Sequence, residues 1–372
     1  MLPGKYSWSE IRGSMDKTML ALILVIFAIG LFSIYSAEAG LRKNVSGFAL
    51  RQSAWGAVSI AAYFGVLSVG YDKFLSASYW IYAASLVVLL ALEVAGTSSH
   101  GAQGWFRFGS VNFQPAEFCK VAIILLLARL CSRHPPETIV KLLSALALSG
   151  VSAAIVMKQP DLGSALVFSA IIFAVIIVAG APYKYIGAIV AAGFAAMPFL
   201  WGMLKQYQKM RLVVFLDPYV DPQGAGYNVI QSRIAVGSGG MWGKGFMHGT
   251  QGRLHFLPEP HTDFIFSVFA EEFGFIGGVI VIALFAMLFW RILRAGMRTK
   301  EMSAKLICVG VSAWLWFQVM ESIAMSMGLA PITGLPMPLF SYGGSSLLME
   351  FVALALVQSI AVSQVRDKIQ QV

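Results

Sequence analysis

The sequence predicts an all-α, polytopic integral membrane protein of about ten transmembrane helices with one large extracytoplasmic loop. The chain of 372 residues is 58% hydrophobic and only 12% charged, whereas soluble domains carry about 25% charged residues. Apolar runs of membrane-spanning length recur along the chain, and basic residues gather at alternate ends of these runs. We therefore expect residues 1–372 to form a single transmembrane domain, with 204–265 as its large loop.

Each predicted span is an apolar run, since crossing a bilayer takes roughly 20 apolar residues. The first run, Met19–Ala37, is too long for the core of a signal peptide and lacks a convincing cleavage site. We interpret it as the first span. The predicted spans are 18–37, 52–70, 74–95, 116–132, 140–158, 162–180, 184–203, 266–290, 305–328 and 346–364.

The basic residues predict that both termini are cytoplasmic, because Lys and Arg are in excess in cytoplasmic loops. With that orientation the short outer loops hold few of them: Arg42, Lys43, Arg51 and Arg107. The cytoplasmic segments hold Lys5, Arg12, Lys17, Lys73, Arg129, Arg133, Lys141, Lys184, Arg291, Arg294, Arg298, Lys300, Lys305, Arg366 and Lys368. The net charge of +9 is thus explained by topology and does not indicate nucleic-acid binding.

The stretch 204–265 is far longer than a typical connection of about 4–6 residues. Its aromatic residues indicate packing, and its glycines indicate tight turns or close backbone approach. The aromatic residues are Tyr207, Phe215, Tyr219, Tyr227, Trp242, Phe246 and Phe256, and the glycines are Gly237, Gly239, Gly240, Gly243 and Gly245. The three cysteines, Cys119, Cys131 and Cys308, fall in or beside predicted spans. We expect them to be packing residues, without disulfides or a metal cluster.

Charged residues inside predicted spans mark candidate functional positions, because a charge in the membrane is expensive. Glu117 and Lys120 follow Gln114-Pro115 at the start of the fourth span and lie one helical turn apart. They are compatible with a structural ion pair or with a cavity wall that supplies a cation. Asp161 follows Pro160 between two spans, where it is compatible with a helix cap or with the same cavity.

Further polar residues lie near the last three spans. Asp263 stands at the start of an apolar helix, where the helix dipole favours a carboxylate. Glu271 and Glu272 precede Phe273-Gly274 and are interpreted as a structural pair at a bend, while Glu321 and Glu350 are interior polar residues without an evident basic partner. The segment 331–346 is rich in Pro and Gly, which predicts a rigid loop. It is compatible with a structural plug or with binding of a pyrophosphate or sugar by backbone N–H groups.

At these residues the chain resembles the SEDS family, and within it the RodA branch. The matching stretches are Phe113 to Glu117, Gln159 to Gly163, Leu216 to Gly274 and Gly334 to Ser346, and together the resemblance covers nearly the whole chain. The stretch Asp221 to Ser232 resembles RodA rather than the division paralogue FtsW. Three features depart from the family pattern: Gly104 stands where an Arg precedes Trp105, with Arg107 three residues on as a candidate replacement, Ser322 and Ala324 replace Asn and Gly, and Pro260 stands where the family varies.

The resemblance implies a peptidoglycan glycosyltransferase that polymerises lipid II into β-1,4 glycan strands during cell elongation. Inversion at the donor sugar needs one general base and no enzyme nucleophile. The resemblance carries Asp263 over as that base, and Glu117, Lys120 and Asp161 as important positions. The leaving pyrophosphate favours positive charge. The candidate partners for it are Arg51, Arg107, Lys120, Arg211 and Lys244.

The resemblance also implies an extracytoplasmic active site in the bacterial cytoplasmic (inner) membrane, and a class B penicillin-binding protein as transpeptidase partner in the elongation machinery. Small residues such as Gly274 and Gly278 would permit a close approach of helices. A divalent cation, Mg or Mn, is compatible with the reaction, but the sequence does not indicate a binding site for it. Two other functions stay open, a lipid II flippase and a non-catalytic scaffold for a penicillin-binding protein, because broken helices and intramembrane charges suit transport as well.

Overall fold

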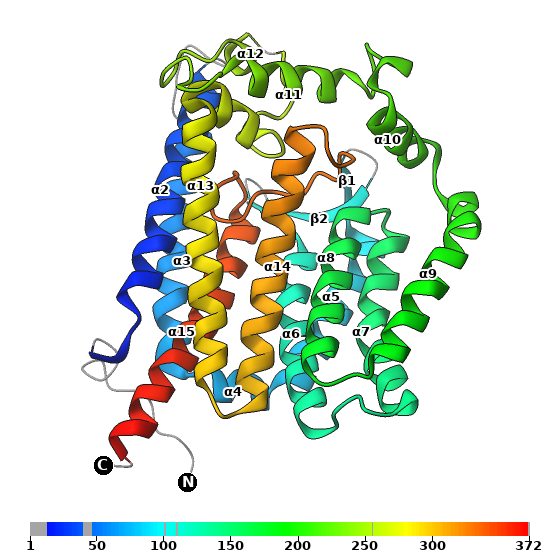
Figure 1. Ribbon diagram of the computed structural model, residues 1–372, viewed down its shortest axis with the longest axis vertical. Helices are drawn as coiled ribbons and strands as arrows, with labels where there is room; N and C mark the ends of the chain where they lie inside the picture. The colour runs from blue at the N-terminus through cyan, green and yellow to red at the C-terminus, as the bar shows by residue number, and fades with distance from the viewer. Residues whose placement is uncertain (1–12, 40–46, 100–101, 109–110, 255, 371–372) are drawn as a thin grey trace.

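The computed structural model describes residues 13–39, 47–99, 102–108, 111–254 and 256–370. It is a bundle of long helices in which α2 begins and α15 ends at the same end (Figure 1). We call this the terminal end, and we call the opposite end, which carries the strands and α10 to α12, the loop end. The long helices are α2 (Lys17–Ala39), α3 (Phe48–Val69), α5 (Ser78–Ala95), α6 (Pro115–Arg133), α7 (Ile139–Lys158), α8 (Leu162–Val178), α9 (Tyr183–Met203), α13 (Ile265–Arg298), α14 (Met302–Ser326) and α15 (Gly344–Gln370).

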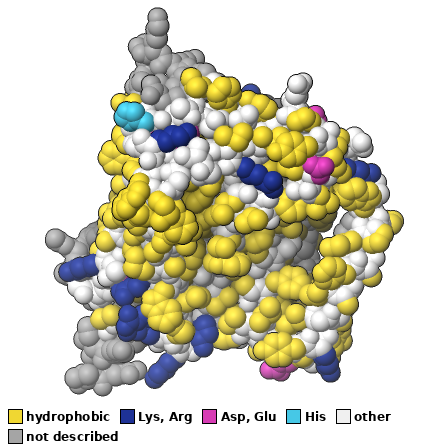
Figure 2. All heavy atoms as spheres, turned by 45° about the horizontal axis from the view of Figure 1, so that its top comes forward, with side chains coloured by type: hydrophobic (Ala, Val, Ile, Leu, Met, Phe, Trp, Pro, Cys, Tyr) yellow, Lys and Arg dark blue, Asp and Glu magenta, His cyan; other side chains and the backbone are white. Residues whose placement is uncertain are grey.

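Every predicted span corresponds to one of these helices, so the predicted multi-pass membrane architecture is confirmed. Among the described residues, six helices are long and apolar enough to cross a membrane, namely α2, α3, α7, α13, α14 and α15, and three shorter apolar helices are parts of α5, α8 and α9. Figure 2 shows hydrophobic side chains spread over the flank of the bundle, with Lys and Arg in its lower part and in its upper part. This distribution suits a surface that faces lipid between two polar boundaries.

Helix α6 is a predicted span that its charged residues set apart from the six long apolar helices. Any window of 18 residues within it contains Glu117, Lys120 and Arg129, which exceeds two charged residues. The helix tolerates them because it lies at the centre of the bundle, packed against α5, α7, α8 and α14. Most of its side chains are buried, including those of Glu117 and Lys120. The charges in α6 therefore face protein rather than lipid.

A small antiparallel sheet at the loop end is the main departure from the all-α prediction. Its strands, in the order β1-β2-β3, are β1 (Thr97–Ser99), β2 (Ala102–Phe108) and β3 (Val111–Phe113). In the order of the chain these strands lie between α5 and α6. Gly104 is the extra residue of a bulge in β2, since Thr97 pairs with Trp105 and Ser98 with Gln103.

The long loop is ordered, as its aromatic residues indicated. It contains α10 (Gln206–Leu216), the 3-10 helix η1 (Pro218–Val220), α11 (Tyr227–Ser238) and α12 (Thr250–Arg253), and a further short helix, α4 (Tyr71–Ser76), lies at the terminal end. In Figure 1, α10 leads from the peripheral helix α9, and α11 and α12 cross above α13. On α9 the large apolar side chains of Phe194, Met197 and Phe199 are exposed. A helix with such a surface is suited to contact with lipid.

The expected bend after Glu271 and Glu272 is present in α13. At Gly274 the backbone leaves the helical conformation, with φ +65° and ψ −163°. The carbonyl groups of Glu271 and Glu272 accept hydrogen bonds from N–H groups of loop residues 244 and 245 at 3.0 and 2.9 Å, and N–H groups just beyond the bend donate to loop carbonyls at 2.8 and 3.2 Å. The loop thus supplies hydrogen-bond partners for the backbone N–H and C=O groups that lose their helical partners at the bend. Non-helical backbone at membrane depth is tolerated where such partners are present.

Replacing Gly274 with alanine is expected to lower the thermal stability of the protein. The conformation at Gly274 is nearly restricted to glycine, and such strain costs on the order of 1–3 kcal/mol. A Cβ at this position would also lie 2.3 Å from the backbone nitrogen of Gly243. Gly278→Ala is the matched control on the same helix, because its Cβ would meet only Phe266, at 3.7 Å. Equal melting midpoints of the two variants in detergent would show that the loop does not depend on this bend.

Candidate functional site

Four helices begin close together at the loop end of the bundle. Gln114, at the start of α6, donates from Nε2 to Asp161 Oδ2 at 3.4 Å, and its backbone N–H donates to Ser345 Oγ in the first turn of α15, also at 3.4 Å. Asp161 caps α8. The segment before α13 joins them, since Ser341 Oγ donates to the carbonyl oxygen of Thr262 at 2.7 Å. Helix N-termini carry partial positive charge, so this meeting point favours an anionic ligand.

The loop between α14 and α15 links the surrounding elements through three successive residues, 332–334. Arg211 Nη1 of α10 donates to the carbonyl oxygen of Ile332 at 3.2 Å. The hydroxyl of Thr333 donates to Glu321 Oε1 of α14 at 2.5 Å. At Gly334, whose φ is +74°, an added Cβ would stand 3.4 Å from Asp263 Oδ2. This segment therefore brings an arginine and two carboxylates from three different elements around one loop.

Asp263 lies just before α13 and is half-buried. It directly follows a segment fixed by its neighbours, in which the carbonyl oxygen of His261 accepts from the N–H of Tyr342 at 2.9 Å. The ring of His261 is stacked on Phe48 at a centroid distance of 4.1 Å. Burial lowers the pKa of His261, although the carboxylates of Glu259 and Glu38 favour its charged form. A neutral, stacked His261 holds the segment in place and leaves Asp263 as the acidic group beside Gly334.

Glu117 and Lys120 form an ion pair. The sequence was compatible with such a pair or with a cavity wall that supplies a cation. Lys120 Nζ lies 2.6 Å from Glu117 Oε1, and the two side chains are 0% and 1% exposed. The ammonium also lies over the ring of Trp314, 5.2 Å from its centroid. Both residues are thus placed inside the bundle and bonded to each other, rather than on an open wall at the loop end.

Asp161 has the geometry of a helix cap. Its Oδ1 accepts from the N–H of Ser164 at 2.9 Å, and its Oδ2 accepts from the Ser164 hydroxyl at 2.7 Å. The chain is broken between α7 and α8, as Pro160 predicted. Tyr207 of α10 donates to the carbonyl oxygen of Pro160 at 3.5 Å, which places α10 over this break. The structure therefore brings Asp161 to the same loop end as Asp263 and Arg211, and both oxygens of Asp161 accept hydrogen bonds from Ser164.

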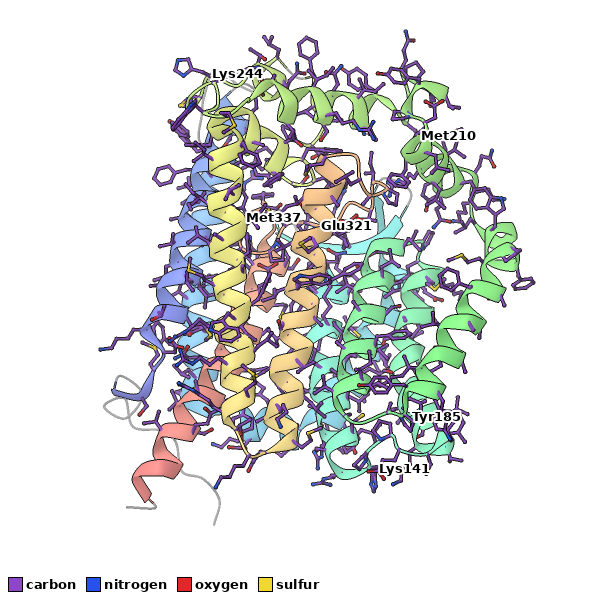
Figure 3. All side chains as sticks on the ribbon, viewed as in Figure 1. Lys141, Tyr185, Met210, Lys244, Glu321 and Met337 are labelled. Carbon is purple, nitrogen blue, oxygen red and sulfur yellow. The ribbon has the colours of Figure 1, made fainter. Side chains whose placement is uncertain are left out.

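The other basic candidates have settings of their own. Lys244 is bonded to Glu271 Oε1 at 2.6 Å and to Thr250 Oγ1 at 3.0 Å, and Figure 3 shows it at the top of the molecule, well away from Glu321. Arg51 and Arg107 are exposed. Arg107 lies on β2, opposite Asn112. Of the arginines and lysines proposed from the sequence, Arg211 is the one that contacts the 332–334 segment.

The interpretation of Gly274 and Gly278 as a helix-docking pair is wrong for Gly274. Its free space is filled by the loop, whose residues Met241 and Gly243 stand closest to it. The apolar face that α13 leaves exposed is formed by other residues, including Phe275, Val279 and Ile282, at 63%, 47% and 45% exposure. These follow the spacing of one helix face.

The family of the chain follows from its comparison with known proteins. Residues 16–366 match the model of the FtsW/RodA/SpoVE family, described as "Cell cycle protein". The chain is 36% identical over 361 residues to "Peptidoglycan glycosyltransferase MrdB" of Escherichia coli K12, covering 96% of this chain and 95% of that protein. The chain belongs to the FtsW/RodA/SpoVE family.

Solved structures agree with this assignment. One chain, described as "Structural coordination of polymerization and crosslinking by a peptidoglycan synthase complex", matches with a TM-score of 0.81 at 30% identity, covering 94% of this chain and 98% of that one. The crystal structure of Rod shape determining protein RodA from Thermus thermophilus matches with a TM-score of 0.71 at 29% identity, over 94% and 97% of the two chains. The resemblance drawn from the motifs is therefore confirmed, and so is the polytopic all-α fold.

The departures from the family pattern have distinct structural settings. Gly104 occupies the β2 bulge, and a Cβ built there would meet nothing within 4 Å. Ser322 is fully buried, and its hydroxyl makes no hydrogen bond within the described part of the chain. The preceding residue, Glu321, is the functional candidate that the sequence did not single out, since its partner Thr333 belongs to the following loop.

A metal site is not apparent from side chains alone. Over the described residues, no group of three or more His, Cys, Asp or Glu side chains is placed to hold a metal ion. The three cysteines are buried and unpaired. They lie within α6 and α14 and serve as packing residues.

Proposed function

We propose that this chain polymerises lipid II into β-1,4 glycan strands, as a peptidoglycan glycosyltransferase of cell elongation and cell-shape maintenance. The observation that carries the proposal is the position of Asp263. A half-buried carboxylate stands beside Gly334, at a point where four helix N-termini and Arg211 supply positive charge. This is the pairing that an inverting displacement needs, with one base for the acceptor and positive charge for the leaving group.

In the proposed reaction, Asp263 takes the proton from the acceptor sugar hydroxyl. The hydroxyl oxygen attacks the anomeric carbon of the donor, the bond from that carbon to the pyrophosphate breaks, and undecaprenyl pyrophosphate leaves with inversion. Arg211 and the helix N-termini stabilise the negative charge on the departing group. Lys120 and Lys244 take no direct part in this scheme, because each is already bonded to a glutamate.

We propose that a divalent cation, where one takes part, comes with the pyrophosphate. Mg²⁺ is commonly held by one or two carboxylates together with substrate phosphates, so it does not require three protein ligands. The residues at the loop end fit such a cation, since Asp263 and Glu321 supply carboxylates against one loop segment. A bound cation would add positive charge at the leaving group.

The site is proposed to face outward from the bacterial cytoplasmic membrane. Both described chain ends lie at the terminal end, and the start of α13, which Asp263 precedes, lies at the loop end. The excess of Lys and Arg toward the terminal end supports a cytoplasmic position for that end. A topology reporter inserted at residue 230, in α11, should therefore read extracytoplasmic. A cytoplasmic signal there would contradict this site, because the proposal places the donor pyrophosphate on the outer face.

A class B penicillin-binding protein is the proposed partner. One of the solved relatives belongs to a peptidoglycan synthase complex described as coordinating polymerization and crosslinking. The exposed face of α13 around Phe275, Val279 and Ile282 is a suitable docking surface for a single membrane helix. Co-purification with the elongation transpeptidase in mild detergent tests the pairing. If the two folded proteins do not co-purify, the proposed partner is wrong.

The deciding experiment is polymerisation of labelled lipid II by the purified protein, alone and with the transpeptidase. Glycan strands that a muramidase degrades are the expected product. A flippase would instead move lipid II across a vesicle membrane without making strands, and a scaffold would do neither. If neither preparation makes glycan while both proteins are folded, the proposed function is wrong.

A further inference from the structure

The first turn of α3 packs against the two chain segments that meet at the candidate site, the loop before α15 and the segment before α13. Phe48 begins α3, and its ring stacks on His261 at 4.1 Å and meets the ring of Tyr342 edge-on at 5.0 Å. Gln52 lies one turn further along the same face of α3 and is 0% exposed. Any effect of Gln52 on a reaction must therefore pass through the residues that it contacts.

The side-chain amide of Gln52 bonds to the two backbone groups that flank Tyr342. Its Nε2 donates to the carbonyl oxygen of Ser341 at 3.1 Å, and its Oε1 accepts from the N–H of Gly343 at 3.2 Å. A carboxamide carries a donor and an acceptor in fixed geometry, so it can satisfy both groups at once. One buried side chain thus holds the backbone of three successive residues, 341–343.

The same short segment is bonded to the residues that directly precede Asp263. The hydroxyl of Ser341 donates to the carbonyl oxygen of Thr262 at 2.7 Å. The N–H of Tyr342 donates to the carbonyl oxygen of His261 at 2.9 Å. These hydrogen bonds connect Asp263 to the amide on α3 through one stretch of backbone.

The loop that carries this segment depends on its neighbours for its conformation. Leu339 has φ +62°, which a non-glycine residue keeps only where the surrounding structure holds it. Its N–H donates to Glu350 Oε2 of α15 at 2.8 Å. At Gly30 of α2 an added Cβ would lie 2.6 Å from the backbone of Phe340. Three helices thus hold the loop, and of these contacts the bonds of Gln52 are the ones to residues 341 and 343.

We propose that Gln52 is a positioning residue that fixes Asp263 in the geometry for taking the proton of the acceptor hydroxyl. The inference rests on the proposed function, in which Asp263 is the base. Gln52 exchanges no atom or proton with the substrate. It holds residues 341–343, and these hold the two residues before Asp263. The rate is sensitive to such support, because a displacement of about 1 Å at a reacting group can cost on the order of 10²-fold.

The test is the kinetics of Gln52→Met. Methionine keeps the length and the apolar contacts of the side chain but cannot replace its two hydrogen bonds. We expect kcat for lipid II polymerisation to fall by about 10- to 10²-fold. The KM for lipid II should stay near the wild-type value, because a displaced base weakens an interaction made in the transition state rather than substrate binding.

Two further variants separate this role from a general structural one. Gln364→Met is the matched control, since Gln364 Nε2 donates to the carbonyl oxygen of Ala295 at 2.7 Å near the terminal end. It should lower the melting midpoint in detergent and keep kcat. Ser341→Ala removes the bond to Thr262 and leaves Gln52 unchanged, so it should lower kcat, and it serves as the test if Gln52→Met does not fold. The double variant should lose much less than the product of the two single losses, because both changes interrupt one connection.

Amide hydrogen exchange gives a readout that does not depend on activity. In Gln52→Met, peptides covering 258–264 and 340–346 should exchange faster than in the wild-type protein, and in Gln364→Met they should exchange at the wild-type rate. Unchanged exchange in Gln52→Met would show that the amide does not hold the segment before Asp263, and the inference would be wrong.

The kinetic outcomes keep this inference apart from the function on which it rests. If the wild-type protein polymerises lipid II and folded Gln52→Met keeps the wild-type kcat, the inference is wrong. A raised KM with unchanged kcat also overturns it, because Gln52 would then support substrate binding instead of Asp263. If the wild-type protein makes no glycan, the proposed function fails, and hydrogen exchange still decides whether Gln52 holds the segment.

Discussion

Replacing Asp263 with asparagine is expected to lower the rate of glycan polymerisation by about 10²–10⁴-fold. Asparagine has nearly the same shape, but its amide cannot take the proton of the acceptor hydroxyl. The segment before Asp263 is fixed by contacts that the change does not touch, namely the stacking of His261 on Phe48 and the bond from Ser341 to Thr262. The variant should therefore insert, fold and bind lipid II normally. Turnover of labelled lipid II and a separate binding assay measure the two properties.

Asp217→Asn is the matched control. Asp217 lies in the same loop region and is exposed, and its Oδ1 accepts from the N–H of Tyr219 at 2.9 Å at the start of η1. The same chemical change there should leave polymerisation near the wild-type rate. Normal synthesis by purified Asp263→Asn would falsify the assignment, and Asp161 would become the next candidate. Because Asp161 caps α8, Asp161→Ala should also reduce stability, by about 0.5–2 kcal/mol.

The sequence was sufficient for those features of the fold that depend on local patterns. Apolar length located the helices, and Pro160 marked the break between α7 and α8. The glycines at 240–245 indicated a close backbone approach, which the structure shows at Gly274. These signals are readable because each depends on a run of neighbouring residues or on the backbone limits of one residue type.

The partners of charged side chains that lie on different elements could not be predicted from the sequence, because they depend on which helices and loops meet in the fold. Lys244 was a candidate for pyrophosphate, but Glu271 lies 27 residues further along and is bonded to it. Glu321 had no basic partner in sequence, and the structure shows that its hydrogen-bond partner is the Thr333 hydroxyl, next to Gly334, which Asp263 approaches. Only the i,i+3 pair of Glu117 and Lys120 was visible in advance, since both lie on one turn of one helix.

Removing one member of that pair is expected to destabilise the protein strongly. Lys120→Met should cost about 3–5 kcal/mol, because it leaves Glu117 charged and unpaired inside the bundle. Both side chains are almost fully buried, and the second carboxylate oxygen of Glu117 already has no hydrogen-bond partner within the described residues. Unfolding of the purified protein in detergent, by heat or denaturant, measures the loss.

The double variant Glu117→Leu/Lys120→Met removes both charges and should be much more stable than Lys120→Met alone, since replacing a whole buried pair is often nearly neutral. The reversal Glu117→Lys/Lys120→Glu should likewise regain part of the stability that either single reversal loses. The coupling free energy from these cycles isolates the pair. If Lys120→Met is instead as stable as the wild-type protein and loses only polymerisation, Lys120 serves the pyrophosphate, and the buried pair is not its main role.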